Sequence, residues 1–269
     1  MAGVKIRVLE ILKKNSNDFV SGQRISDELG ITRTAIWKNI KSLKDNGYTI
    51  LSLTNKGYKL VDCPDTLTYE EINEDLKTKF IGRKIVHFDS IESTNIEAKK
   101  LAEQGEKEGT IVVAEEQTLG KARMGEKWYS PRGEGIWMSI ILKPKISPEF
   151  AAEVTNATVE AVGKALIKIE PSVEIKKPND IFVNDKKMCG ILTEIDGELN
   201  LLNYVIVGIG INVNQEQFPE SMKLKYTSLR ICKNKVFLRK KLLCDILNNI
   251  EPMYEDLLMK IRKPSHRGS

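Results

Sequence analysis

The chain has 269 residues, of which 41% are apolar and 29% are charged. This length and composition exclude intrinsic disorder and collagen-like repeats, and they predict two folded domains. Apolar runs are far shorter than the roughly 20 residues that cross a bilayer, and residues 1–7 lack the apolar stretch of a signal peptide. We therefore expect a cytoplasmic protein without membrane contact.

Cysteine and histidine usage limits the chemistry. The four cysteines are scattered without a C-x-x-C pair, so reduced thiols are expected rather than a zinc site or a disulfide framework. Of the two histidines, His266 falls in a polar tail, and a Ser-His-Asp triad would need His87. An ordinary histidine is the simpler interpretation of His87, so the chemistry is expected to depend on other groups.

The excess positive charge is concentrated at the start of the chain. Residues 1–62 contain 11 Lys and Arg against 6 Asp and Glu, whereas the remainder contains 31 of each kind. A basic segment attached to a neutral body indicates that the first part contacts nucleic acid.

Three helices and a hairpin are predicted in this basic segment. Apolar residues at helical spacing mark residues 4–12 and 22–29, and a third helix follows the candidate N-cap Thr32 and ends at Asn46 and Gly47. Strand-like runs at 48–53 and 57–61 enclose a turn. This order is typical of a winged helix-turn-helix.

The third helix carries polar and cationic side chains that suit contacts with phosphates and base edges in a major groove. A solvated helix face with an incidental basic bias is the alternative. The candidate DNA-contacting residues are Ser21, Gln23, Arg24, Thr32, Arg33, Thr34, Trp37, Lys38 and Lys41.

The rest of the chain predicts an α+β domain with a mixed sheet. Strands are expected at 85–88, 110–115, 136–143, 173–176, 180–183, 190–195 and 204–212, and helices at 94–103, 148–169 and 238–262. The expected parts are a DNA-binding domain at 1–62, a linker at 63–80 with a helix over 69–79, a second domain at 81–262 and a polar tail at 263–269.

Four polar or glycine-rich segments interrupt the second domain. Residues 93–95 (Ser-Thr-Asn) either cap the next helix, which is the simpler interpretation, or present hydroxyls to a ligand. The loop 117–131 interleaves small residues with cations, which suits phosphate, although a flexible surface loop is the alternative. Lys187 enters an apolar strand, where a charge calls for an anionic partner. The glycines of 208–214 would admit a ligand or a neighbouring backbone.

These segments carry a family resemblance. Together with the winged helix, they make residues 1–262 resemble the biotin protein ligases, and specifically the bifunctional kind that is also the biotin operon repressor. The motifs are Ser93-Thr94-Asn95, Gln117…Gly120-x-x-Arg123-x-Gly125-x-x-Trp128-x-Ser130-Pro131, Lys176-x-Pro178-Asn179-Asp180, Lys187-x-x-Gly190-Ile191-Leu192-x-Glu194 and Gly208-x-Gly210-Ile211-Asn212.

The resemblance implies a class II synthetase-like catalytic domain and a two-step reaction. Biotin and ATP, with Mg²⁺, would form biotinyl-5′-adenylate, and biotin would then pass to a lysine of a biotin carboxyl carrier domain of a carboxylase. Ligand binding would favour a homodimer on operator DNA. Lipoate ligases share the catalytic fold, so the acyl substrate also follows from the resemblance.

The resemblance also implies residue roles. Arg123 and Lys187 would be catalytic, and Asp180 would approach Mg²⁺ carried by ATP. Biotin would contact Ser93, Thr94, Asn95, Gln117, Gly120, Lys121, Ala122, Arg123, Trp128, Lys187 and Gly190. ATP would contact Lys176, Asn179, Asp180, Lys187 and Asn212.

Several residues depart from the family pattern. Lys121 and Ala122 replace an Arg and a Gly of the usual G-R-G-R-x-G loop, and alanine at a positive φ would cost about 1 kcal/mol. Glu126 stands where an Arg is common, and Lys177 replaces a Trp. The usual C-terminal SH3-like barrel is expected to be absent. The alternative is therefore a biotin- or biotinyl-adenylate-responsive repressor with weak or no ligase activity.

Overall fold

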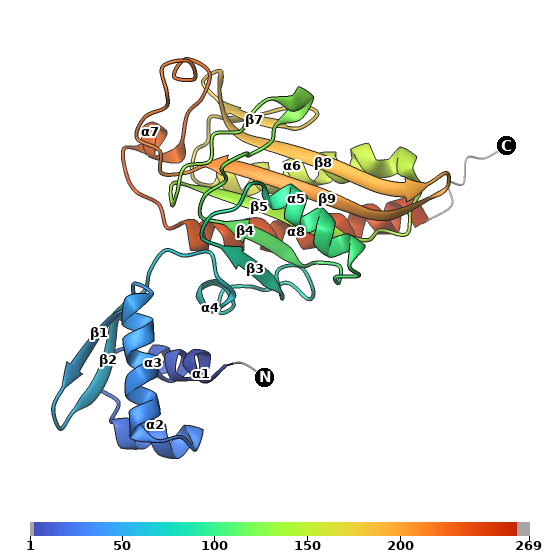
Figure 1. The fold of residues 1–269 in the computed structure, drawn as a ribbon. Coiled ribbons are helices and arrows are strands. Elements are labelled where there is room, and N and C mark those ends of the chain that lie inside the picture. The colour runs from blue at the N-terminus through green and yellow to red at the C-terminus, as the bar shows by residue number, and fades with distance from the viewer. Residues whose placement is uncertain (1–2, 263–269) are drawn as a thin grey trace. The chain divides into compact units, whose positions relative to one another are not determined.

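The computed structural model describes residues 3–262. The tail at 263–269, with His266, lies outside the described residues. Two compact units divide the chain, one up to Asp65 and the other from Thr66 (Figure 1). Within residues 3–262, no helix is both long enough and apolar enough to cross a bilayer.

The first unit is the predicted winged helix-turn-helix. Its elements are α1 (Val4–Lys14), α2 (Gly22–Leu29), α3 (Arg33–Asp45), β1 (Thr49–Leu53) and β2 (Gly57–Asp62). Ser21 Oγ accepts a hydrogen bond from the Arg24 amide and so caps α2, while Thr32 Oγ1 caps α3 as predicted. Apolar residues from all three helices and the hairpin form one core.

The hairpin is held against the helices by backbone contacts. The amide of Val20 donates to the Tyr58 carbonyl at 2.8 Å, and the Tyr58 amide donates back at 2.9 Å. Gly57 allows this contact, since it has φ +105° and an added Cβ would lie 2.1 Å from the Val20 carbonyl oxygen. The wing is thereby fixed beside the start of α2.

The second unit contains the predicted mixed sheet, in the order β3-β4-β5-β9-β8-β7-β6. Only the β3–β4 pair is parallel. The strands are β3 (Ile85–Phe88), β4 (Ile111–Ala114), β5 (Gly135–Leu142), β6 (Val173–Lys176), β7 (Asp180–Val183), β8 (Lys186–Glu198) and β9 (Leu201–Asn212).

Helices cover both faces of this sheet. α5 (Thr94–Glu103) packs on one face, and α6 (Ala151–Ile167) and α8 (Arg239–Arg262) pack on the other (Figure 1). Because both faces are covered, every residue of β5 is buried. The shorter elements are the 3₁₀ turn η2 (Pro148–Phe150), which forms the start of the helix predicted over 148–169, and the 3₁₀ turn η1 (Arg123–Gly125) and helix α7 (Leu229–Lys233), which the sequence did not predict.

The predicted linking helix over 69–79 is wrong beyond its first turn, because α4 spans only Tyr69–Ile72. Side chains of α8 bind the amides that a longer helix would use. Asn248 Oδ1 accepts from the Lys77 amide at 2.7 Å, and Glu251 Oε1 accepts from the Lys79 amide at 2.5 Å. Residues 66–81 also contribute to the core of the second unit, so this segment packs as part of that unit.

Candidate functional site

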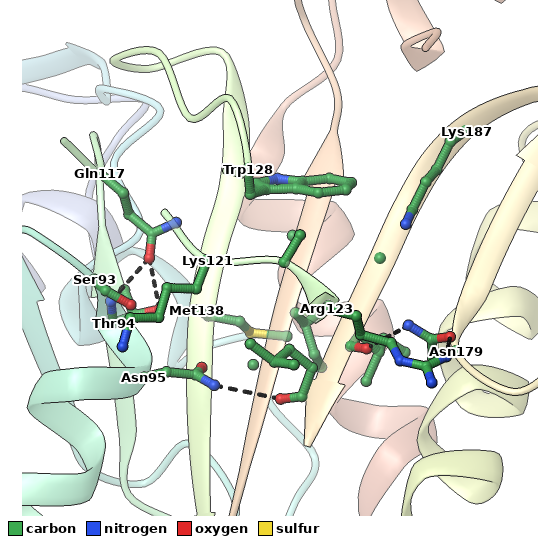
Figure 2. Close-up of a pocket in the computed structure, with 17 residues that line it drawn as sticks. Ser93, Thr94, Asn95, Gln117, Lys121, Arg123, Trp128, Met138, Asn179 and Lys187 are labelled. Atoms are coloured by element: carbon green, nitrogen blue, oxygen red, sulfur yellow. Dashed lines mark hydrogen bonds between the residues drawn. The ribbon is translucent and has the colours of Figure 1, made fainter. Parts of the chain in front are cut away.

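A pocket of about 430 Å³ opens between the start of α5, the loop 117–131 and strands β5, β8 and β9. The pocket is lined by Ser93, Thr94, Asn95, Gln117, Lys121, Ala122, Arg123, Trp128, Met138, Asn179, Lys187, Gly190, Ile191, Leu192, Gly208, Ile209 and Gly210. Figure 2 shows the polar side chains Ser93, Thr94, Asn95 and Gln117, together with Lys121, on one side and Arg123, Asn179 and Lys187 on the other.

The uncharged side is built on the first turn of α5. Gln117 Oε1 accepts from the Thr94 amide at 2.8 Å and lies 3.0 Å from Thr94 Oγ1, while Gln117 Nε2 donates to Ser130 Oγ at 2.9 Å. Ser93 occupies the N-cap position, but its side chain makes no capping bond. The simpler interpretation of Ser93 as a cap is therefore wrong, and the Ser93 side chain lines the pocket instead.

Asn95 extends this polar side toward β8. Its Nδ2 donates to Glu194 Oε2 at 2.7 Å, and its Oδ1 lies 2.6 Å from Ser139 Oγ. Gly208 makes room for it, because an added Cβ would lie 2.1 Å from Asn95 Oδ1. A side chain therefore uses the space that we expected a ligand or backbone to use. The sequence did not indicate Ser139, since it lies within a continuous apolar strand.

The opposite side is cationic. Arg123 Nη1 donates to Asn179 Oδ1 at 3.0 Å, and Lys187 Nζ lies 2.7 Å from Asp180 Oδ1. This ion pair provides the anionic partner that the position of Lys187 required. Lys121 is a third lining cation, and in Figure 2 its side chain lies on the side of Ser93, Thr94 and Asn95; none of the lining residues is acidic. The pocket therefore combines a mainly uncharged, hydrogen-bonding end with an end that carries Arg123 and Lys187 and suits an anion.

Trp128 forms a wall between the two ends (Figure 2). Its ring centroid lies 5.3 Å from Lys187 Nζ, within the range of a cation–π contact. Gly190 and Gly210 admit the indole, because added Cβ atoms would lie 2.9 Å from Cζ3 and 2.4 Å from Nε1. The glycine spacing thus accommodates a tryptophan ring from the loop 117–131.

Ala122, one of the residues that depart from the family pattern, is not under backbone strain. Its φ is −117°, an extended conformation that any residue adopts, and its amide donates to the Glu126 carbonyl at 2.8 Å. The positive φ values of the loop occur at Met124 and Gly125 instead. The expected cost of alanine is therefore not incurred at this position. Position 120, in contrast, requires glycine, because an added Cβ would lie 2.5 Å from the Trp128 carbonyl oxygen.

Some predicted residues lie outside the pocket lining. Lys176 forms an exposed ion pair with Asp185 at 2.7 Å, which raises the pKa of Lys176 through that hydrogen bond. Asn212 is buried and accepts from Gln215 Nε2 at 3.1 Å, while its own Nδ2 has no hydrogen-bond partner. Gly120 and Asp180 support lining residues, namely Trp128 and Lys187, without lining the pocket themselves.

The residues present do not form a metal site of their own. The described part of the chain contains no group of three or more His, Cys, Asp or Glu side chains that could hold a metal ion. The candidate ligand Asp180 contributes one carboxylate, which Lys187 already pairs. Any Mg²⁺ would depend mainly on oxygen ligands from a phosphate substrate.

Aromatic rings cluster beside the cationic end. Tyr226 packs edge-on against Trp128 at 5.8 Å between centroids, and Phe218 lies 6.0 Å from Tyr226 and 6.3 Å from Tyr129. Burial and the charges of Glu126 and Asp180 raise the pKa of Tyr226. The segment 213–228 is thus joined to the loop 117–131 by ring contacts.

The nine candidate DNA-contacting residues are all exposed. Trp37 is 55% exposed, and Lys41 Nζ lies 5.8 Å from its ring centroid. The side chains of Ser21 and Thr32 serve as helix caps, and Gln23 Nε2 donates to Asp27 at 2.7 Å. Lys44 Nζ donates to Ser52 Oγ at 3.1 Å, whereas Arg24, Arg33 and Lys38 are exposed and make no side-chain hydrogen bond or ion pair among the described contacts, which leaves them open to a nucleic acid.

Comparisons with known proteins agree with both halves of this description. A family model described as "HTH domain" matches residues 5–59, and the "Biotin/lipoate A/B protein ligase family" matches residues 87–212. The solved biotin protein ligase from Aquifex aeolicus in complex with biotin and ATP is similar, with 31% identity, a TM-score of 0.56, and coverage of 68% of this chain and 73% of that one.

Full-length relatives combine the two halves. The bifunctional ligase/repressor BirA of Escherichia coli K12 is 30% identical over 81% of this chain and 66% of its own length. BirA of Bacillus subtilis 168 is 39% identical over 93% of this chain and 78% of its own length. A relative this similar over more than three quarters of its length places the chain in the BirA family of bifunctional ligase/repressors.

Proposed function

We propose that this protein activates biotin with ATP to biotinyl-5′-adenylate, transfers biotin to a lysine of a biotin carboxyl carrier domain, and represses biotin genes by binding operator DNA. The observation that carries the ligase proposal is the division of one pocket into an end lined mainly by uncharged polar groups and an end that carries Arg123 and Lys187. Biotin has the matching division, with a ureido ring at one end and a carboxylate at the other.

The polar end suits the ureido ring. Ser93, Thr94 and Gln117 offer hydroxyl and amide groups, and Asn95 holds this end in place through Ser139 and Glu194. Apolar side chains between the two ends suit the thiolane ring and the aliphatic chain. The proposed biotin contacts are Ser93, Thr94, Asn95, Gln117, Gly120, Lys121, Ala122, Arg123, Trp128, Lys187 and Gly190.

The cationic end suits the chemical step. A carboxylate oxygen of biotin attacks the α-phosphorus of ATP, and pyrophosphate leaves as the bond between the α- and β-phosphates breaks. Arg123 and Lys187 lower the repulsion between these two anions and stabilise charge in the transition state. The carrier lysine amine then attacks the acyl carbon, and AMP leaves. Neither step needs a nucleophile from the enzyme.

The nucleotide is proposed to lie beside Asn179, Asp180, Lys187 and Asn212. Asn212 supports this placement, because its buried Nδ2 lacks a partner and a ligand acceptor would satisfy it. Lys176 is left out, because its ammonium pairs with Asp185 outside the pocket. Mg²⁺ is proposed to enter with the ATP phosphates, and no step is assigned to it.

The winged helix is proposed to contact operator DNA through α3 and the wing. The exposed cations Arg33, Lys38 and Lys41 would position the helix on phosphates, and the pattern of exposed polar groups would read base edges. A ligand-promoted homodimer would place two such helices on two half-sites.

The decisive test is incorporation of labelled biotin into a purified carrier domain with ATP and Mg²⁺, beside an assay for adenylate formation alone. Transfer of label is expected. A carrier whose acceptor lysine is replaced by arginine is the control. Adenylate without transfer would place the defect in carrier docking, whereas neither product would overturn the ligase proposal and favour a biotin-responsive repressor.

A further inference from the structure

We propose that Trp37 is a specificity-determining residue of the winged helix, which selects thymine in the major groove of DNA by covering its C5-methyl group. This inference rests on the proposed DNA binding and adds to it the base that α3 selects. Trp37 lies in the second turn of α3 and is 55% exposed. Among the described residues it takes no part in the hydrophobic core of its unit, so packing does not account for it.

The exposed face around Trp37 is cationic. From Arg33 to Lys44, α3 carries four cations, all of them exposed, and no acidic residue. One of the four, Lys41, places its Nζ 5.8 Å from the Trp37 ring centroid, within the range of a cation–π contact. Two copies of this face would bring cations against cations, whereas a polyanion would pair with them. The charge of the face therefore favours DNA over a second copy of the chain as its partner.

The position of Trp37 along α3 places its ring near base edges. Side chains of an α-helix lean toward the N-terminus of the helix, so Trp37 covers the first turn, which begins at Arg33. In a helix-turn-helix, the N-terminal residues of the recognition helix contact base edges in the major groove. The indole therefore faces the bases, whereas the cations that flank it suit the phosphates on either side.

The chemistry of the indole selects the base. Its one polar group is a single N–H donor, and the rest of the ring is apolar. Amino, carbonyl and N7 groups of bases lose hydrogen bonds to water when an apolar ring covers them. The C5-methyl of thymine is instead an apolar group on a major-groove base edge, and covering it removes apolar surface of both partners from water. The indole thus favours thymine at the position that it covers.

The test uses a DNA duplex that the wild type selects from a random-sequence pool in the presence of biotin and ATP. Each thymine of the selected site is replaced in turn by deoxyuridine, which removes only the C5-methyl group, and the Kd is measured by fluorescence anisotropy. At the thymine that Trp37 covers, the replacement is expected to weaken binding by the wild type about fourfold, the factor for one buried methyl group. In Trp37→Ala, the same replacement is expected to leave the Kd unchanged.

Thr34→Ser and Lys38→Ala are the matched controls, because both residues are exposed on α3 beside Trp37. Thr34→Ser removes a neighbouring methyl group, and Lys38→Ala removes a cation, which weakens binding to all duplexes by one factor and lowers the salt dependence. Both variants are expected to keep the fourfold effect at the thymine that Trp37 covers. If Trp37→Ala binds too weakly to measure, Trp37→Phe keeps a smaller apolar ring and is expected to show an intermediate factor.

The outcomes separate this inference from the proposed DNA binding. A wild type that selects no duplex would overturn both. A wild type that binds its site but tolerates deoxyuridine at every thymine would overturn the inference alone, and so would a thymine effect that persists in Trp37→Ala. Loss of a ligand-promoted dimer in Trp37→Ala, measured by sedimentation velocity, would place the residue at an interface between copies of the chain and would also overturn the inference.

Discussion

Arg123 lines the pocket, and we propose that its guanidinium holds the phosphate of the adenylate. We expect Arg123→Ala to speed adenylate dissociation by 10- to 100-fold, on the scale of about 1.5–3 kcal/mol for a hydrogen bond to a charged group. Release of labelled adenylate, followed by rapid filtration, measures this rate. Arg132→Ala is the control, because Arg132 contacts only surface carboxylates at 3.8–3.9 Å.

The contact between Arg123 and Asn179 refines this expectation. Asn179 is buried, and its Nδ2 donates to the Ile191 carbonyl at 3.0 Å, so its carboxamide is held in place to receive the guanidinium. Asn179→Ala is therefore also expected to speed adenylate dissociation, but by a smaller factor than Arg123→Ala. Equal release rates for wild type and Arg123→Ala would contradict the placement of Arg123 at the phosphate.

Glu115 makes stability depend on pH. Burial by itself raises its pKa, but the hydrogen bond with His87 and the charge of Arg239 outweigh burial and lower the pKa from 4.5 to about 2. Because the folded-state pKa is the lower one, the Glu115 carboxylate stabilises the fold above about pH 4.5. That contribution, about 3 kcal/mol, is lost as the pH falls from 4.5 toward 2.

The variant Glu115→Gln tests this linkage. At pH 7 it is expected to lower the free energy of unfolding by about 3 kcal/mol, because Arg239 loses a buried partner at 2.8 Å. The difference in the free energy of unfolding between the variant and the wild type should shrink as the pH approaches 2. Urea titrations at several pH values measure this difference. Glu116→Gln, at an exposed neighbouring position, should leave the pH profile unchanged. A constant difference at all pH values would contradict the assignment.

The sequence predicted individual site residues where a motif marks them. The Ser93-Thr94-Asn95 turn, Gln117, Arg123 and Lys187 all reach one pocket from separate segments. Residues without a local signal were missed. Ser139 lies in a strand of buried residues whose two faces look alike in sequence, so only the pairing of β5 with its neighbours shows that it faces α5.

At the scale of elements, the strands were predictable because apolar runs end at polar or glycine-rich turns. Each predicted strand is present, although β8 begins at Lys186 and extends to Glu198. The prediction of a helix over 69–79 was wrong because of contacts with a distant part of the chain. Its amides are bound by side chains of α8 about 170 positions later, which no local pattern reveals.

Glu251 is the centre of this long-range attachment. It is 3% exposed and accepts from three consecutive amides, those of Lys79, Phe80 and Ile81. We expect Glu251→Ala to destabilise the second unit by about 3 kcal/mol, since one buried and two partly buried amides lose their acceptor. Hydrogen exchange of the 79–81 amides should accelerate at least 100-fold.

Glu255→Ala is the matched control on the next turn of α8. Glu255 pairs with Lys79 at 3.0 Å on the surface, where an ion pair contributes about 0–1 kcal/mol. In Glu255→Ala, the hydrogen-exchange rates of the 79–81 amides should stay within a few-fold of the wild-type rates. If Glu251→Ala left these amides as protected as in wild type, the segment would be held by its apolar contacts alone.

At the scale of the whole molecule, charge and chemistry are divided between the two units. The excess positive charge lies in residues 1–62, while the pocket lies entirely in the second unit. A monomer offers one α3 to DNA, and repression through two half-sites needs two. Ligand binding must therefore act on assembly if biotin is to control DNA binding.

Sedimentation velocity tests this coupling. Without ligand the protein is expected to sediment as a monomer, and with biotin and ATP as a dimer of twice the mass. Since we propose that the adenylate promotes dimerisation, Arg123→Ala should need at least tenfold more biotin to dimerise, whereas Arg132→Ala should follow the wild type. A wild type that stays monomeric at saturating ligand would contradict ligand-promoted dimerisation and require one chain to repress alone. A dimer present without ligand would instead remove assembly as the controlled step.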